Sequence, residues 1–204
     1  MKINWRSKGI WWGFFLGSLL PLMERIYQAL WGDLGTDPGK TLTESLGTIA
    51  LMFLGMTLAI TPLKRWSSVN LVHLRRMVGL YTFFYASLHV SAYLIFLADW
   101  SAFIDDVLKR PYIFVGLVAF LILSALAGTS FKTMMRRLGK RWKALHRLVY
   151  PASILVVVHY AWQARGDYTT LLIYGLGLAL LLALRLPGRS SPSLNARVAA
   201  SPRP

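Results

Sequence analysis

The chain has 204 residues, of which 55% are hydrophobic, and it carries a formal net charge of +15 without a single cysteine. The absence of cysteine excludes disulfides, iron–sulfur clusters and thiolate-bound metals. A mean hydropathy of +0.49 is too high for an ordinary soluble domain, and the apolar residues occur in long blocks that are typical of a membrane protein.

Six apolar segments approach the roughly 20 residues that a helix needs to cross about 30 Å of hydrocarbon. They are residues 10–30, 44–62, 76–97, 111–131, 143–164 and 169–186. The first segment lacks the small-residue cleavage site of a signal peptide. Pro62, followed by two basic residues, is expected to end the second helix. The sequence therefore predicts an all-α membrane protein: a bundle of six transmembrane helices within residues 1–186, then a disordered cytoplasmic tail in 187–204.

The distribution of charge predicts which side faces the cytoplasm. If the N-terminus is cytoplasmic, 18 of the 23 lysines and arginines fall in cytoplasmic segments, and all eight acidic residues lie in or beside the opposite segments. This asymmetry follows the positive-inside rule and places both termini in the cytoplasm. It also argues against nucleic acid as the partner of the positive charge. The basic loop 132–147 is expected to lie on anionic membrane lipid or to dock an acidic cytosolic partner.

Two histidines lie well inside predicted helices, His89 in YTFFYASLHVSAYLIFL and His159 in PASILVVVHYAW. An ionisable residue at membrane depth is usually paired, faces a cavity or has a function, and neutral imidazole is a common metal ligand. The two helices run parallel, and each histidine follows a residue near the inner end, Arg76 or His146, by 13 positions, or about 20 Å of helix. The two imidazoles are therefore expected at similar depth, where they would ligate one haem.

Arg76 and His146 are expected to form a second level near the cytoplasmic surface. His146 can ligate iron, so one or two haems are predicted, whereas guanidinium stays protonated and is a poor ligand. At 100° per residue, 13 positions leave the side chains of the outer and inner levels about 140° apart around an ideal helix. This difference in direction is a difficulty for a second haem stacked at the inner level. Arg75 and Arg76 are expected to be positive-inside residues or to pair with haem propionates or a flavin phosphate. His73, in the inner loop, is expected to be solvated.

Two other classes of protein compete with this interpretation. A transporter or proton channel with a histidine relay is expected to carry acidic residues or broken helices at mid-membrane. Glu24 is the only acidic residue well inside a predicted span. A haem enzyme that acts directly on oxygen or on a diffusible substrate needs an open iron position, which two histidine ligands do not leave.

Several long motifs resemble one family. LRRMVGLYTFFYASLHVSAY, LGKRWKALHRLVYPASILVVVHYAW and LLIYGLGLALLLALR, together with LGTDPGK and ITPLKRW, are similar to MsrQ proteins, the haem-binding membrane subunits of a methionine-sulfoxide reductase system. The resemblance covers nearly the whole chain. More distantly, the helices are similar to ferric-reductase and NADPH-oxidase membrane domains, which carry two histidines on each of two helices. Arg76 stands at one of those four positions.

The resemblance implies an electron-transfer subunit of the bacterial inner membrane that binds haem b and FMN. It implies a cytosolic flavin reductase or quinone as the electron donor. The implied acceptor is a periplasmic molybdopterin enzyme that reduces methionine sulfoxide in oxidised proteins. The substrate-reducing site would then lie on a partner chain.

Overall fold

A computed structural model of the chain describes residues 8–32, 34–67, 69–98, 100–163 and 168–185. The predicted tail, 187–204, lies outside the described residues. Every regular element within the described residues is a helix. The elements are α1 (Lys8–Gly17), α2 (Leu20–Leu30), α3 (Pro38–Trp66), η1 (Val72–Leu74), α4 (Arg75–Phe96), α5 (Trp100–Lys109), α6 (Pro111–Gly128), α7 (Lys132–Leu138), α8 (Lys140–His146), α9 (Val149–Gln163) and α10 (Tyr168–Ala183).

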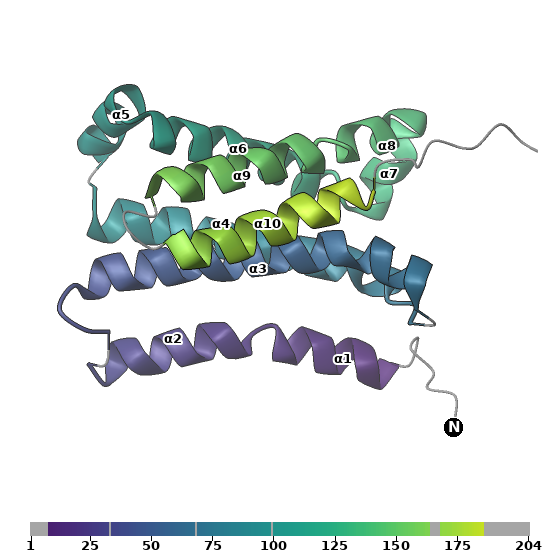
Figure 1. The fold of residues 1–204 in the computed structure, drawn as a ribbon, viewed down its shortest axis with the longest axis horizontal. Coiled ribbons are helices and arrows are strands. Elements are labelled where there is room, and N and C mark those ends of the chain that lie inside the picture. Colours follow the sequence, from purple (N-terminus) through teal and green to yellow (C-terminus); the bar gives the residue numbers. More distant parts are fainter. Residues whose placement is uncertain (1–7, 33, 68, 99, 164–167, 186–204) are drawn as a thin grey trace, which may run out of the picture.

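The helices α3, α4, α6, α9 and α10 run side by side, with α5 at one end of the bundle and α7 and α8 at the other (Figure 1). We call these the α5 end and the α7–α8 end. Among the residues that the structure describes, four stretches are long and apolar enough to cross a membrane, and residues 169–183 form a shorter apolar helix. The four stretches are Pro38–Trp66, Val72–Phe96, Pro111–Gly128 and Lys140–Gln163. The all-α membrane architecture is confirmed, while the count of six spans and the cytoplasmic termini stay predictions.

The first predicted span is two helices rather than one. Pro21 has no N–H with which to continue the ladder of backbone hydrogen bonds, and the helix is interrupted between α1 and α2. Tyr81 of α4 donates its hydroxyl to the Phe15 carbonyl at 2.9 Å. Tyr85, also of α4, donates to the Ser18 carbonyl at 2.6 Å. These bonds satisfy carbonyls at the break, which lipid could not do.

The second predicted span does not end at Pro62, as the sequence suggested, because α3 continues through it to Trp66. Proline leaves the carbonyl four residues earlier, that of Leu58, without its helical N–H. Arg185 supplies the missing donor: its Nε lies 3.1 Å from the Leu58 oxygen. Its Nη2 also donates to the Thr57 carbonyl at 3.2 Å. The prediction was wrong because this donor comes from 127 residues further along the chain.

The helix α3 lies at the centre of the packing. One of its faces meets α4, where Phe53 stacks on Tyr85 with ring centroids 5.2 Å apart. Another face meets α6, α9 and α10 through a cluster that includes the buried Leu54, Leu58 and Leu178. With neighbours on both faces, α3 holds the α4 side and the α6–α9 side of the bundle in a fixed relation.

The membrane orientation can be tested by cysteine labelling, because the native chain contains no cysteine. Thr36, between α2 and α3, is exposed at the α5 end, and Thr133 is exposed in α7. We expect Thr36→Cys to react with an impermeant maleimide added from the periplasmic side. Thr133→Cys should react only after the inner membrane is opened. The reverse labelling pattern would place the α7–α8 end outside the cytoplasm.

Candidate functional site

His89 of α4 and His159 of α9 face each other inside the bundle. Their ring centroids are 6.2 Å apart and their ring planes are inclined at 77°. Both side chains are partly buried. The two rings therefore lie at the same depth, as the equal residue counts from the inner helix ends predicted.

Each of these imidazoles has one nitrogen held by a backbone carbonyl of a neighbouring helix. His89 Nδ1 lies 2.8 Å from the Thr43 oxygen in α3. His159 Nδ1 lies 2.7 Å from the Tyr112 oxygen in α6. A carbonyl oxygen can only accept a hydrogen bond, so we assign the proton to Nδ1 in both rings. The Nε2 of each neutral ring then keeps its lone pair, which is the form that binds a metal ion.

Two glycines allow the rings to approach these carbonyls. A Cβ added to Gly47 of α3 would lie 3.0 Å from His89 Nδ1. A Cβ added to Gly116 of α6 would lie 2.7 Å from His159 Nδ1, a separation that real Cβ atoms essentially never show. The absence of a side chain at these two positions is therefore what leaves room for the imidazoles.

The same local arrangement occurs twice. Gly47 follows Thr43 by four residues, and Gly116 follows Tyr112 by four residues. Each histidine thus packs over one helical turn that begins with its carbonyl partner and ends with glycine. None of these four residues was identified from the sequence. The four-residue spacing was the only signal of these residues in the sequence. It could be interpreted only once the structure showed that each turn faces a histidine.

The inner-level residues Arg76 and His146 lie near the end of α6. The Arg76 guanidinium carbon is 5.8 Å from the centroid of the Phe131 ring. His146 Nε2 lies 3.2 Å from the Thr129 hydroxyl oxygen, and its ring centroid is 4.1 Å from that of Trp142. The structure therefore pairs His146 with a hydroxyl and an indole rather than with a second imidazole.

Arg75 and His73 occupy surroundings that the sequence did not indicate. Arg75 lines a cavity of about 220 Å³ at the α7–α8 end. Both ring nitrogens of His73 are buried and have no hydrogen-bond partner within the described part of the chain. The prediction that His73 is solvated was wrong, because Val72–Leu74 forms a 3₁₀ turn packed against α3 and α4 instead of an open loop.

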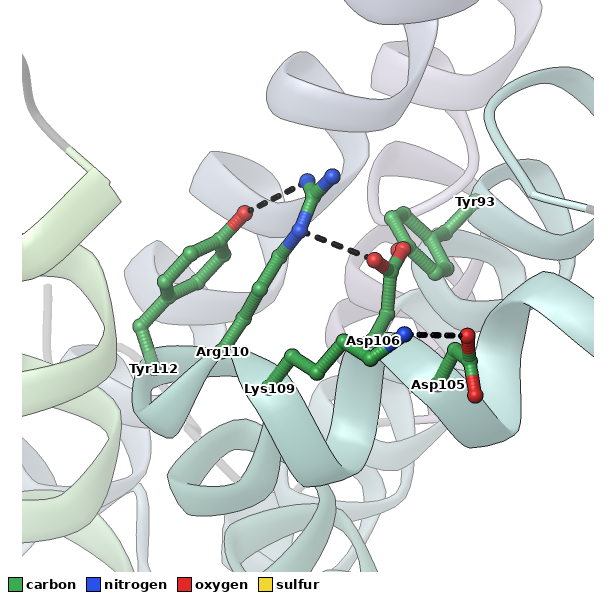
Figure 2. Close-up of polar contacts among 6 residues, drawn as sticks. All are labelled: Tyr93, Asp105, Asp106, Lys109, Arg110 and Tyr112. Carbon is green, nitrogen blue, oxygen red and sulfur yellow. Dashed lines mark hydrogen bonds and ion pairs between the residues drawn. The ribbon is translucent and has the colours of Figure 1, made fainter.

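A polar network lies at the α5 end (Figure 2). It includes Tyr112, whose ring centroid is 6.2 Å from that of His159. Arg110 Nε is 2.8 Å from Asp106 Oδ1, and Arg110 Nη1 is 3.4 Å from the Tyr112 hydroxyl. Tyr93 of α4 donates its hydroxyl to the other oxygen of Asp106. The hydrogen bond to Tyr112 and the charge of Asp106 both raise the pKa of Arg110. The network links α4, α5 and α6 through Tyr112, whose carbonyl also contacts His159.

Two adjacent aspartates provide a test of this network. The Asp106 side chain is 16% exposed and bonds to Arg110 and Tyr93, whereas Asp105 is 61% exposed and pairs with Lys109. We expect Asp106→Asn to lower the free energy of unfolding by about 1–2 kcal/mol, because it weakens charge-assisted bonds between helices. Asp105→Asn should change it by less than about 0.5 kcal/mol. Thermal unfolding in detergent measures both, and equal effects would show that the network does not stabilise the bundle.

Comparison with known proteins adds to this geometry. Residues 46–157 match the family described as ferric reductase like transmembrane component, a stretch that includes His89 and ends two residues before His159. Over 176 residues the chain is 46% identical to the protein-methionine-sulfoxide reductase heme-binding subunit MsrQ of Rhodospirillum rubrum, with 84% of this chain and 85% of the relative covered.

Two further relatives carry the same description. The chain is 45% identical over 178 residues to the MsrQ subunit of Herminiimonas arsenicoxydans, with 84% of this chain and 82% of the relative covered. It is 44% identical over 177 residues to the MsrQ subunit of Bordetella pertussis, with 84% and 86% covered. The similarity therefore extends over most of each protein.

Proposed function

Because the chain belongs to the MsrQ family of ferric reductase like membrane proteins, we propose that it is the haem-binding subunit of a protein-methionine-sulfoxide reductase system. The observation that carries the proposal is the pair of facing imidazoles, each with Nδ1 on a backbone carbonyl. In this proposal His89 and His159 are the two axial ligands of a haem b.

The separation of the two rings supports a metal held between them. Two imidazoles that held one metal ion through Nε2, with metal–nitrogen bonds of about 2 Å and ring radii of about 1 Å, would have centroids roughly 6 Å apart. The observed separation is 6.2 Å. When bound, haem iron with two nitrogen ligands supplies reversible one-electron transfer.

The surrounding residues prepare the two imidazoles for this role. The carbonyls of Thr43 and Tyr112 accept Nδ1–H, which fixes the tautomer and ring orientation and makes Nε2 a better donor to a metal. If both histidines hold the iron, they would leave it no open position for a substrate. The proposed activity is therefore electron transfer, and methionine sulfoxide would be reduced on a partner chain.

We propose that electrons enter at the α7–α8 end and leave at the α5 end, in a bacterial inner membrane. The α7 and α8 sequences, KTMMRRL and KRWKALH, are strongly basic, as expected of a cytoplasmic surface. Tyr112 is the second residue of α6 and Thr43 the sixth of α3. The histidine pair therefore lies within about 8 Å of these helix starts. A periplasmic molybdopterin reductase is the proposed acceptor, and a cytosolic flavin reductase or a quinone is the proposed donor.

One haem rather than two is the proposed content. His146 would have to give up its contact with the Thr129 hydroxyl to hold iron through Nε2, and the Arg76 guanidinium has no lone pair to offer as a ligand. Arg76 also lies about 20 Å of helix from His89. The 220 Å³ cavity beside Arg75 is smaller than the roughly 300–1,000 Å³ of typical small-molecule pockets, so it does not fit a whole flavin. No step of the proposed function depends on FMN in this chain.

The axial assignment predicts distinct spectra for four alanine variants. His89→Ala and His159→Ala should each abolish the low-spin b-type spectrum, because each removes one axial imidazole. His146→Ala and His73→Ala should keep it. Reduced-minus-oxidised optical spectra of the purified proteins measure this. If His146→Ala gives high-spin haem while His159→Ala does not, His89 and His146 are the ligands; a wild-type protein without haem would favour the transporter or proton channel.

The glycine contacts give a second, independent prediction. Gly116→Ala places a Cβ against His159 Nδ1 and should weaken haem binding by roughly 10–100-fold, as expected when an outer partner of a ligand is disturbed. Gly47→Ala should have a smaller effect because its contact is longer. The matched controls are Gly128→Ala in α6 and Gly55→Ala in α3, where an added Cβ meets nothing within 4 Å. Haem titration measures the affinities, and wild-type affinity in Gly116→Ala would contradict the proposal.

A further inference from the structure

A small basic cavity lies among helix ends at the α7–α8 end of the bundle. Its volume is about 220 Å³, and its walls include Arg65 at the end of α3 and Arg75 at the start of α4. Tyr150 of α9 and Arg185, just beyond α10, also line the cavity. Three arginines from separate parts of the chain, the end of α3, the start of α4 and the residues after α10, thus line one space.

The positive charge in this cavity is not balanced by carboxylates within the described parts of the chain. The ion pairs of those parts lie in α2, in the first turns of α3, and at α5 and the residue that follows it. Arg75 is partly buried, and its charge is close enough to that of Arg185 for the two to repel. An anion between them would remove this repulsion.

Arg185 is held in place independently of any ligand. Its guanidinium donates to the Leu58 and Thr57 carbonyls, and its central carbon lies 5.9 Å from the centroid of the Tyr150 ring. These contacts stabilise the turn of α3 that Pro62 interrupts. The arginine is therefore fixed at the cavity wall before an anion arrives, which reduces the entropy lost on binding.

We propose that this cavity binds a phosphate group, with Arg65, Arg75 and Arg185 as its contacts. Guanidinium groups recognise phosphate oxygens through paired, charge-assisted hydrogen bonds. With a volume of about 220 Å³, the cavity suits a phosphate head and lies below the roughly 300–1,000 Å³ of typical small-molecule pockets. The phosphate can belong to an anionic phospholipid of the inner leaflet or to a free phosphate compound, and both reach a cytoplasmic helix end.

The test uses the full-length, haem-loaded protein, purified in detergent and stripped of lipid. One arm adds phosphatidylglycerol, with phosphatidylcholine as the zwitterionic comparison. The other adds inorganic phosphate, with chloride at equal ionic strength as the comparison. Bound lipid is counted by native mass spectrometry, and both arms are followed by the shift in thermal unfolding midpoint, which reports binding to the folded state.

Three variants distinguish binding in the cavity from general attraction to the positive surface. Arg65→Gln and Arg75→Gln each remove one proposed contact, and Lys64→Gln removes the same charge from an exposed neighbour that does not line the cavity. We expect the first two to weaken binding by about tenfold, the loss typical of one charge-assisted contact. Lys64→Gln should stay within about twofold of the wild type. An unchanged haem spectrum shows that each variant is folded, and the exposed Arg65 site carries the test if Arg75→Gln is unstable.

The two arms also identify the source of the phosphate. Loss of phosphatidylglycerol binding alone identifies a lipid headgroup, and loss of inorganic phosphate binding alone identifies a soluble ligand. Loss of both shows a site that accepts either. The proposal is wrong if the wild type responds to neither ligand, if the arginine variants bind as well as the wild type, or if Lys64→Gln loses as much binding as they do.

Discussion

The hydrogen bond between an imidazole Nδ1 and a helix carbonyl is the interaction on which the proposed site depends. A neutral histidine inside a membrane has two polar nitrogens, and leaving either unsatisfied is unfavourable. The Thr43 and Tyr112 carbonyls satisfy one nitrogen of His89 and His159, respectively. Because a carbonyl oxygen has two lone pairs, each can accept this bond in addition to its helical one. With Nδ1 bonded to a carbonyl, Nε2 of each ring remains available to bind a metal ion.

This requirement explains why the bundle is built from two similar helix pairs. In each pair, one helix provides a carbonyl near its start and a glycine one turn later, and the other helix provides the histidine. The starts of α3 and α6 both carry proline, at Pro38 and Pro111, which suits the first turn of a helix. Neither pair alone surrounds a metal, whereas the two pairs together place imidazoles 6.2 Å apart.

The sequence predicted the features that depend on local quantities. Apolar length marks the helical segments, and helical rise per residue gives the common depth of His89 and His159. The sequence did not predict features that depend on distant donors. The interruption between α1 and α2 involves Tyr81 and Tyr85, and the continuation of α3 through Pro62 involves a guanidinium from beyond α10. The sequence also did not identify the glycines that face the histidines, because their role depends on how the neighbouring helices are rotated about their axes.

The position of the histidine pair also bears on the electron donor. If the α7–α8 end is cytoplasmic, the approximately 20 Å of helix between Arg76 and His89 separates a docked cytosolic donor from the pair. An intermediate carrier near the inner end of this interval would shorten the path of an electron from a cytosolic donor. A quinone approaches through the lipid and does not have to cross the whole interval. The identity of the donor therefore decides whether an inner carrier is needed. Of the two proposed donors, the quinone requires no further cofactor in this chain.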